Sequence, residues 1–432
     1  MGAKKTIIFG IPRLGLTILL GIEAYSVFAL YTIGYKLSPF LVGFTLCVGY
    51  ICTSIFSFLF GWVSDRRYTT WGRRKPYIFI FSPIFSISFI FLLIPSLILP
   101  NLNDKLVLFT WLLIWEIAFR VSLSAMTPYQ AWLAEQFDIT ERPKVSQVQN
   151  VFNLFGTFIL WTFNFIVLTD VFDTFETSVN IIPLNFSLPI IFFALVSVIL
   201  LFLNVFMMPT EPYLEIKSNL GKILRQSLKN KDFMIISFML GLSSISWSMI
   251  VAQILPYFDQ VLHFTTIENL ISLIIVFGVI VVFLDVWRRI MRKFGRKRAL
   301  IYIFYLAIIS LPLTLLNLLP LNSYFFLNTF ILIGIGASLA GWFLVPAVIY
   351  ADLAQGDHEK TGELKAGTYT GFPLIFLNLF QAFGIFLLGI INEMPQINVG
   401  VSFYSIGLIL WGPICSIILG VSLIFIWKFV QI

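Results

Sequence analysis

Charged residues are scarce in this chain. Asp, Glu, Lys and Arg make up 11% of its 432 residues, whereas 59% are hydrophobic. A soluble domain usually carries about 25% charged residues, so the shortage excludes an ordinary soluble fold. The mean hydropathy of +0.95 indicates a polytopic membrane protein instead.

Cysteine and histidine are also rare, with three and two copies. Cys47, Cys52 and Cys415 all fall inside apolar stretches, where they are expected to act as small hydrophobic residues. This excludes a disulfide framework or a cysteine metal cluster, and no cofactor or metal site is expected. His263 and His358 lie near predicted loops, which argues against a proton relay built on histidine.

Apolar stretches long enough for a spanning helix, which needs roughly 20 residues, occur twelve times. They are 13–36, 40–63, 77–99, 107–133, 147–169, 187–208, 232–257, 268–287, 299–319, 325–351, 366–390 and 401–428. No connection between them is long enough for a soluble domain. The sequence therefore predicts an all-α membrane protein of twelve transmembrane helices.

Positive charge falls almost entirely on one side of such a chain. With twelve spans, all but three of the 28 Lys and Arg residues lie on the side of the two termini, the exceptions being Lys36, Lys105 and Arg120. Because positive residues stay in the cytoplasm, both termini are predicted to be cytoplasmic, with the protein in the plasma membrane. The same distribution argues against nucleic acid as the partner of the net charge of +7.

Two short turns repeat one pattern. The segments WGRRK (71–75) and FGRKR (294–298) each read aromatic, Gly and three bases, and each follows an Asp near the end of the preceding span, Asp65 or Asp285. A six-span unit therefore occurs twice. The predicted parts are an N-terminal bundle, 1–209, a cytoplasmic connector, 210–231, and a C-terminal bundle, 232–432.

This charge-and-glycine pattern resembles that of the major facilitator superfamily. The resemblance implies two pseudo-symmetric six-helix bundles that rock around a central site, and a breakable cytoplasmic latch of carboxylates and guanidinium groups. The alternative is that these turns only obey the positive-inside rule. The residues so assigned to gating are Gly61, Asp65, Arg66, Gly72, Arg73, Arg74, Asp285, Gly295, Arg296 and Lys297.

Two longer stretches are more specific. GWVSDRRYTTWGRRKPYI (61–78) and YADLAQGDHEKTGELKAGTYTG (350–371) resemble segments of the glycoside-pentoside-hexuronide:cation symporters, which include melibiose permease and the sucrose carriers. The resemblance implies sugar symport. Thr53 and Ser57 stand where melibiose-type carriers hold sodium with two carboxylates, so the sodium site is expected to be missing. The expected coupling ion is therefore the proton.

Three ionisable residues lie in the middle of predicted spans: Glu23, Glu116 and Arg120. Each costs about 2.5–3.5 kcal/mol to insert, and such residues normally face the bundle interior. Glu116 and Arg120 are four residues apart and can pair on one helix face. The functional interpretation is cation coupling or substrate binding, and the alternatives are a structural ion pair and, for Glu23, a polar contact near a helix end.

A sugar site also needs amide groups and an aromatic platform. The candidates for lining it lie within predicted spans: Gln130, Asn153, Asn164, Trp247, Gln253, Trp342, Asn378 and Gln381. An intramembrane Trp is more often a packing residue or an interfacial anchor. Small residues around Trp342, in GIGASLAGWF (334–343), favour either close helix packing or a bend that lines the cavity.

These observations predict a secondary active transporter that moves a sugar, glycoside or related small polar solute together with protons. No covalent bond is made, so the protein is not expected to be an enzyme, and its partners are the solute and the lipid bilayer. A single chain with both bundles is expected to work as a monomer. The alternatives are a carrier of lysolipids or other amphiphiles on the same fold, and a membrane sensor or scaffold, which would usually carry a soluble signalling domain.

Overall fold

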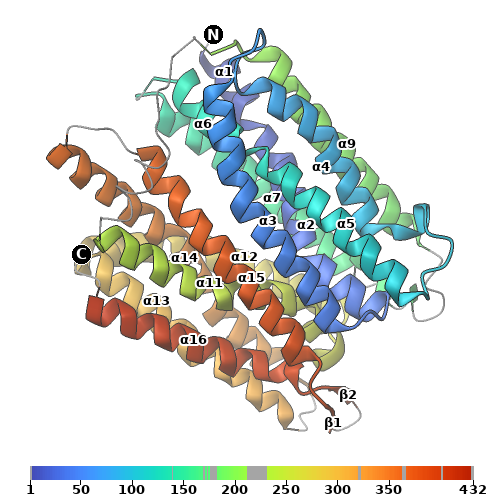
Figure 1. The fold of residues 1–432 in the computed structure, drawn as a ribbon. Coiled ribbons are helices and arrows are strands. Elements are labelled where there is room, and N and C mark those ends of the chain that lie inside the picture. The colour runs from blue at the N-terminus through green and yellow to red at the C-terminus, as the bar shows by residue number, and fades with distance from the viewer. Residues whose placement is uncertain are drawn as a thin grey trace. The chain divides into compact units, whose positions relative to one another are not determined.

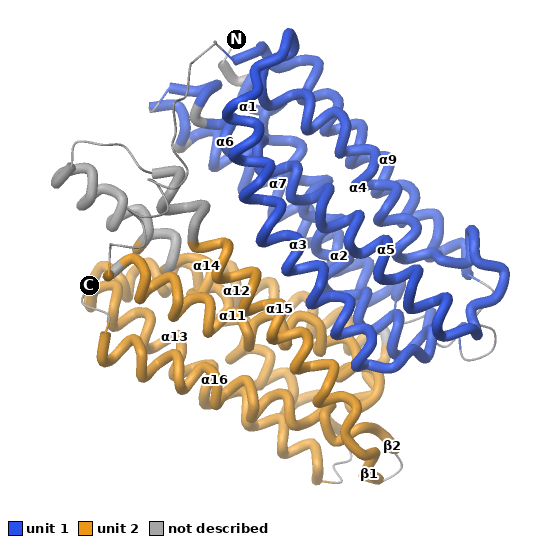
Figure 2. The backbone as a smooth tube through the Cα atoms, viewed as in Figure 1, with its two compact units in different colours: residues 1–218 blue, residues 219–432 orange. Residues whose placement is uncertain are grey.

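The chain forms two compact units, residues 1–218 and 219–432 (Figure 2). The computed structural model describes residues 2–138, 140–168, 171–172, 174–175, 182–211, 231–319, 323–361, 366–399 and 402–429. Most of the predicted connector, 210–231, lies outside these ranges, so its extent stays a prediction. Side chains of the 350–371 motif also lie outside the described part.

The described residues include twelve helical segments long and apolar enough to cross a membrane, which confirms the predicted number. Several differ from the predicted bounds. The first begins at Lys4 rather than at residue 13, because the amphipathic start of the chain is already helical. The other segments overlap the predicted spans, and their ends differ from the predicted ends by up to seven residues.

The named elements among the described residues of the first unit are all helical (Figure 1). Its long elements, in chain order, are α1 (Gly2–Gly10), α2 (Pro12–Ala29), α3 (Pro39–Arg66), α4 (Lys75–Leu93), α5 (Lys105–Ser124), α6 (Thr127–Gln136), α7 (Arg142–Thr162) and α9 (Leu184–Met207). Short segments extend or follow three of them: η1 (Leu30–Gly34), η2 (Pro95–Leu97) and η3 (Phe163–Leu168).

The second unit adds one short hairpin to its helices. The helical elements are α11 (Lys231–Tyr257), η4 (Phe258–Leu262), α12 (Thr266–Phe294), α13 (Arg296–Ser310), η5 (Leu311–Leu318), α14 (Phe325–Thr361), α15 (Ala366–Asn392) and α16 (Gly407–Phe429). Strands β1 (Gln396–Val399) and β2 (Ser402–Ser405) pair antiparallel between α15 and α16. The predicted span 401–428 therefore begins too early, because its first apolar residues form strand β2 and α16 starts at Gly407.

Local sequence explains where several helices begin. Asp104 accepts hydrogen bonds from the backbone amides of Leu106 and Val107 at the start of α5, as an N-cap residue should. Thr265 and Glu268 form a capping box at the start of α12. Proline occupies the first turn of α2, α3, α4, α6 and α7, where its missing amide hydrogen costs nothing.

The same packing pattern occurs in both units. In the first, α2 packs on α7 and α9, α5 packs on α3 and α4, and α4 packs on α9. In the second, α11 packs on α15 and α16, α14 packs on α12 and α13, and α13 packs on α16. Each contact of one unit has its counterpart six spans later, as an internal repeat requires.

The first helix of each unit also ends in the same unusual way. Both α2 and α11 widen into a π-helical turn, η1 and η4, and a residue with positive φ follows within a few positions. That residue is Lys36 (φ 53°) or His263 (φ 48°). Because π-turns often mark functional positions, the repeat conserves a distinctive helix end and not only a charge pattern.

Two connections that the sequence indicated as loops are partly helical. The helix α12 continues to Phe294, so Asp285 lies within a helix and Gly295 alone separates α12 from α13. Helix α14 continues to Thr361, well beyond the apolar stretch. Hydrophobicity locates the part of a helix inside the membrane, whereas its polar extension has no such signal.

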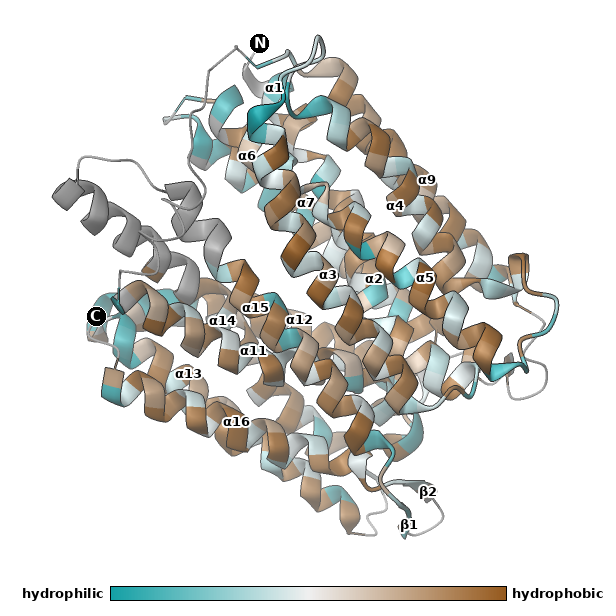
Figure 3. Ribbon diagram, in the orientation of Figure 1, coloured by the Kyte–Doolittle hydropathy of each residue, from teal (hydrophilic) through white to brown (hydrophobic). Residues whose placement is uncertain are grey.

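Many residues with large apolar side chains are exposed on the helices, and the helical ribbons are coloured mostly as hydrophobic in Figure 3. In α9, for example, Leu188, Phe192 and Ile199 are more than half exposed, which suits a surface that meets lipid. Of the cysteines, Cys415 is buried and Cys47 and Cys52 are half-buried, and all three are free thiols.

Candidate functional site

Arg120 gathers the two mid-span carboxylates of the first unit. Its Nε lies 2.8 Å from Glu116 Oε1, one turn earlier on α5, and its Nη2 lies 2.5 Å from Glu23 Oε1 on α2. The three residues are at most 3% exposed. The predicted pair of Glu116 and Arg120 therefore forms, and Glu23 joins it from mid-helix rather than from a helix end.

Helix α3 closes this group from a third side. The ring of Tyr50 lies 3.9 Å from the guanidinium carbon of Arg120, a cation–π contact. Beside it, a Cβ on Gly49 would come within 2.4 Å of Glu116 Oε1. Glycine at this position lets the carboxylate of Glu116 approach the backbone of α3.

The group holds two acids and one base. The second oxygen of each carboxylate, Oε2 of Glu23 and of Glu116, has no hydrogen-bond partner among the described residues. Both carboxylates bond the same guanidinium group, Glu116 through Nε and Glu23 through Nη2. Because an uncompensated buried charge is costly, the arrangement favours one proton on the pair, which makes the whole group neutral. Such a group can take up and release a proton.

A buried amide lies close to this charged group. Ser26 Oγ donates to Asn164 Oδ1 at 2.6 Å, and both residues are fully buried. Ser26 follows Glu23 by three residues, so the two share a face of α2. Asn164 Nδ2 has no partner in the described part of the chain, and Asn164 itself lies in the π-helical segment η3. It leaves one free donor on a side chain that bonds Ser26, which itself lies one helical turn from Glu23 on α2.

The other polar candidates of the first unit are placed differently. Asn153 on α7 accepts a hydrogen bond from Thr17 at 2.7 Å, which joins α7 to α2. Gln130 on α6 is exposed. Neither residue contacts Arg120 or its two carboxylates through any interaction that we observe.

Two tryptophans meet in the second unit. The rings of Trp247 on α11 and Trp342 on α14 lie 5.7 Å apart, and Trp342 Nε1 donates to Ser243 Oγ at 3.0 Å. Trp247 is 3% exposed, and its Nε1 has no partner among the described residues. Trp342 is half-buried, and the Nε1 of Trp247 is the one unused donor that we observe in this pair.

The small residues around Trp342 serve close packing. A Cβ on Gly341 would come within 2.4 Å of Ile303, and one on Gly334 within 1.9 Å of Ser310. Helix α14 runs through this segment without a break. Of the two interpretations of GIGASLAGWF, the structure supports close packing of α14 on α13 and not a bend.

The remaining amides lie on α11 and α15. Gln253 and Asn392 exchange two hydrogen bonds, of 2.8 and 3.2 Å, and so join the two helices. Gln253 is therefore occupied by a structural partner that the sequence did not reveal. Asn378 and Gln381 are half-buried on α15.

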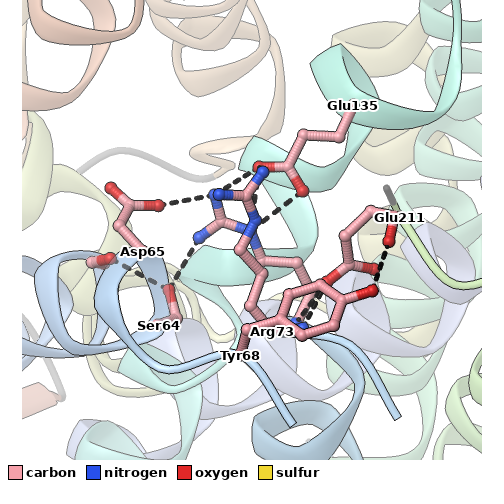
Figure 4. A network of polar contacts seen from close by, with 8 residues as sticks. Ser64, Asp65, Tyr68, Arg73, Glu135 and Glu211 are labelled. Atoms are coloured by element: carbon pink, nitrogen blue, oxygen red, sulfur yellow. Dashed lines mark hydrogen bonds and ion pairs between the residues drawn. The ribbon is translucent and has the colours of Figure 1, made fainter. Parts of the chain in front are cut away.

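The turn between α3 and α4 carries a second ionic network (Figure 4). Arg74 contacts Asp65 at 2.6 Å and Glu135 at 2.5 Å, and it donates to Ser64 Oγ at 2.7 Å. Arg73 lies 3.3 Å from Glu135. Within the first unit, the predicted contact between Asp65 and the arginines is present, with Glu135 at the end of α6 as an additional member.

A carboxylate from the end of α9 fixes the same turn. Glu211 accepts hydrogen bonds from the backbone amides of Arg73 and Arg74, and its carbonyl oxygen accepts one from Tyr68. A Cβ on Gly72, whose φ is 91°, would lie 2.8 Å from the carboxylate of Glu211. Glycine is therefore required here for both its conformation and its size. Sequence reasoning missed Glu135 and Glu211, because nothing in their spacing relates them to residue 72.

Burial and ion pairing act in opposite directions on Arg74. Desolvation alone would lower its pKa, but the hydrogen bonds and charges of Glu135 and Asp65 outweigh it, so that the pKa of Arg74 is raised. The guanidinium stays charged, and the network does not open by losing this proton.

The equivalent turn of the second unit is built differently. Asp285 contacts Arg288 and, at 2.6 Å, Arg289, both on its own helix. Gly295 has φ 85°, and a Cβ there would meet nothing within 4 Å. Gly61 is equally open, whereas Arg66 stacks on the ring of Trp62 at 4.3 Å. Arg296 and Lys297 are half-buried at the start of α13.

Comparison with known proteins identifies the fold. A family model described as MFS/sugar transport protein matches residues 8–428. Among solved structures, the chain is similar to a D-xylose–proton symporter (TM-score 0.73, 17% identity, covering 100% of this chain and 98% of that one). It is also similar to the inward-open xylose transporter XylE from E. coli (0.69, 16%, 100% and 97%) and to the nucleoside transporter NupG (0.62, 16%, 98% and 98%).

No curated protein sequence gives a significant match. At identities of 16–17%, the structural likeness speaks for the fold alone. Together with the family match, it confirms the predicted major facilitator fold. Among the described residues, no group of three or more His, Cys, Asp and Glu could hold a metal ion.

Proposed function

Because this chain belongs to the MFS/sugar transport protein family, and is therefore a secondary active transporter of a sugar or another small solute, we propose that it couples solute movement to protons. The observation that carries the proposal is the buried group of Glu23, Glu116 and Arg120. It is neutral with one proton and negative without it. The protein makes and breaks no covalent bond, so it is not an enzyme.

Coupling needs a difference between the protonated and unprotonated states. A proton on one carboxyl weakens that residue's hold on Arg120 and supplies an O–H donor, whereas its loss returns both carboxylates to the guanidinium. A ligand can shift an equilibrium only by its differential affinity for the two states. A solute that uses the free oxygens of Glu23 and Glu116 therefore binds each state with a different affinity.

The chemistry of the surrounding groups favours a polyhydroxylated solute. Hydroxyl groups can donate to the unused carboxylate oxygens and accept from the free amide donor of Asn164. The structural neighbours include a D-xylose–proton symporter, which is consistent with a sugar but does not identify one.

The buried charges speak against the amphiphile carrier. A cavity for acyl chains would have to bury apolar surface against three ionised or hydrogen-bonding side chains, which is unfavourable. The same three residues also give the protein a transport chemistry that a scaffold does not need.

The segregation of Lys and Arg supports cytoplasmic termini. We also propose that the transporter lies in the plasma membrane, and that it works as a monomer because one chain holds both bundles. On this orientation, the network of Arg73, Arg74, Asp65 and Glu135 lies at the cytoplasmic end of the first unit. Its ion pairs can then break and re-form as the transporter changes between its two open states.

Uptake into proteoliposomes tests the proposal. We expect a pH gradient, alkaline inside, to drive accumulation of at least one compound from a panel of labelled pentoses, hexoses, disaccharides and nucleosides. A protonophore should abolish this accumulation, and a sodium gradient should have no effect. Uptake driven by sodium and indifferent to pH would contradict proton coupling, and uptake of lysolipids alone would contradict the sugar assignment.

A further inference from the structure

The turn between α12 and α13, together with the end of α12, carries more positive charge than the acidic residues described near it can neutralise. Seven basic residues, here called the basic surface, lie within eleven positions: Arg288, Arg289, Arg292, Lys293, Arg296, Lys297 and Arg298. The side chains of Arg288 and Arg289 are 58% and 78% exposed, and Arg292, Lys293 and Arg298 are also exposed.

Among the described residues, one carboxylate is observed in ion pairs with this surface. Asp285 contacts Arg288 and Arg289, and the described part of the chain gives no acidic partner to Arg292, Lys293 or Arg298. Lys297 Nζ instead lies 3.5 Å from the carbonyl oxygen of Trp427, near the end of α16. The positive charge of Arg292, Lys293 and Arg298 is therefore not balanced by an acidic group among the described residues.

The first unit shows that this surplus is not needed for the turn itself. In the matching turn between α3 and α4, Arg73, Arg74 and Lys75 are only 2%, 3% and 9% exposed. They are held by carboxylates and a backbone carbonyl of the same unit. The same sequence pattern thus forms a closed internal network in one unit and an open cationic surface in the other.

Apolar and aromatic side chains continue the basic surface along the helices. Trp427 on α16 is 63% exposed, and Tyr302 on α13 is 41% exposed. Farther from the turn, Ile309 and Ile417 are 66% and 68% exposed, and α13 packs on α16. A cationic end, an aromatic level and an apolar face therefore follow one another along two neighbouring helices, as at a membrane interface.

We propose that the basic surface binds the headgroup of an anionic phospholipid whose acyl chains lie along α13 and α16. Arginine forks suit phosphate oxygens, and clusters of four to eight basic residues next to a spanning helix attract anionic lipids. A zwitterionic headgroup carries its own cation, so it compensates the surface less well. This inference concerns the lipid and holds whatever solute the protein transports.

Native mass spectrometry of the purified full-length protein, titrated with phosphatidylglycerol or phosphatidylcholine, tests the proposal. We expect phosphatidylglycerol adducts to be detected at lipid concentrations at least ~10-fold lower than those needed for phosphatidylcholine adducts. The variant Arg292→Gln/Lys293→Gln/Arg298→Gln should lose this preference. The control Arg67→Gln/Lys144→Gln/Lys231→Gln removes three charges from other exposed positions on the same side and should keep it.

Three results would overturn the proposal. The first is a basic-surface variant that still prefers phosphatidylglycerol as strongly as the wild type does. The second is a control variant that loses this preference to the same extent as the basic-surface variant. The third is displacement of phosphatidylglycerol by inorganic phosphate at millimolar concentration, which would indicate a free-anion site. If the variant does not fold, crosslinking of a diazirine-labelled phosphatidylglycerol to the wild-type protein decides: labels should concentrate on α13 and α16, and an even spread over all outward helices would exclude the site.

Discussion

At the scale of single residues, the feature that matters most is the imbalance of two acids and one base in a buried position. Glu116 and Arg120 could be predicted as a pair, because residues four apart share a helix face. The third member could not, since Glu23 lies 97 residues from Arg120 and no local spacing relates them. The contacts of Tyr50 and Gly49 with this group could not be predicted either, because an aromatic residue and a glycine in an apolar span do not indicate a charged neighbour.

Neutralising either carboxylate should uncouple transport. With Glu23→Gln or Glu116→Gln, the group holds one acid and one base and is neutral without a proton. We expect uptake driven by a pH gradient to fall at least ~10-fold, while exchange of labelled solute at equal concentrations on both sides continues. Glu141→Gln, which removes an exposed carboxylate at the start of α7, is the control. Full gradient-driven uptake by both variants would refute the assignment.

Removing the base should instead destabilise the protein. Arg120→Gln leaves two buried carboxyl groups without a counter-ion, and breaking a buried ion pair in this way costs about 3–5 kcal/mol. The thermal midpoint in detergent should fall markedly. The double variant Glu23→Gln/Arg120→Gln should recover part of the loss, because it removes one of the two unpaired acids. Equal midpoints for the single and double variants would show that the charges are not coupled.

The contact between Gly49 and Glu116 can be tested within one helix. Gly49→Ala forces the carboxylate away from α3, and overpacking of this kind costs about 1–3 kcal/mol. Gly61→Ala, twelve residues later on α3, meets open space and should change the stability little. We expect the first variant alone to lower both the thermal midpoint and proton-driven uptake. Similar behaviour of the two variants would mean that helix propensity, not the carboxylate, determines the result.

At the scale of elements, the two repeated turns share a sequence pattern and differ in their contacts. Sequence alone indicated the glycine and the three bases in both, and the structure adds that both glycines have positive φ. It could not indicate which turn is fixed by neighbouring elements, because Glu135 and Glu211 come from α6 and from the end of α9. Residues that only tertiary packing brings together show no periodic pattern in the sequence.

A matched pair of glycine substitutions separates these effects. Gly72→Ala and Gly295→Ala both place a side chain at positive φ, which costs about 1 kcal/mol. Only Gly72→Ala also displaces Glu211 from the backbone amides of Arg73 and Arg74, and hydrogen bonds to a charged group contribute a further ~1.5–3 kcal/mol. We expect a larger loss of stability for Gly72→Ala, together with faster amide exchange at residues 73 and 74. Equal losses of stability in the two variants would show that the hydrogen bonds of Glu211 do not stabilise the turn.

At the scale of the whole molecule, hydrophobicity and charge together predicted twelve spans in two related units. This succeeded because spanning segments must be long and apolar. The helical extension of α14 to Thr361 lies outside the predicted spans, so it had no comparable signal. Strand β2 lies inside the predicted span 401–428, because apolar composition alone does not separate a short strand from the start of a helix. The orientation of the termini remains a prediction from the charge distribution.

Labelling tests this orientation directly. In a background with Cys47, Cys52 and Cys415 replaced, single cysteines at Arg67, Arg298 and Asn103 occupy exposed positions. A membrane-impermeant maleimide should label position 103 in intact cells, and should label positions 67 and 298 only in inverted vesicles. Labelling of 67 or 298 from outside the cell would reverse the assignment.

The odd count of charges around Arg120 also has an electrical consequence. A transporter that returns empty would carry one net negative charge with its unprotonated first unit, whereas the proton-loaded form would carry none there. A unit charge that crosses the full membrane field gains or loses about 2.3 kcal/mol per 100 mV. An interior-negative voltage would therefore push the empty carrier outward and leave the loaded one indifferent, so that the resting potential resets the carrier for its next cycle.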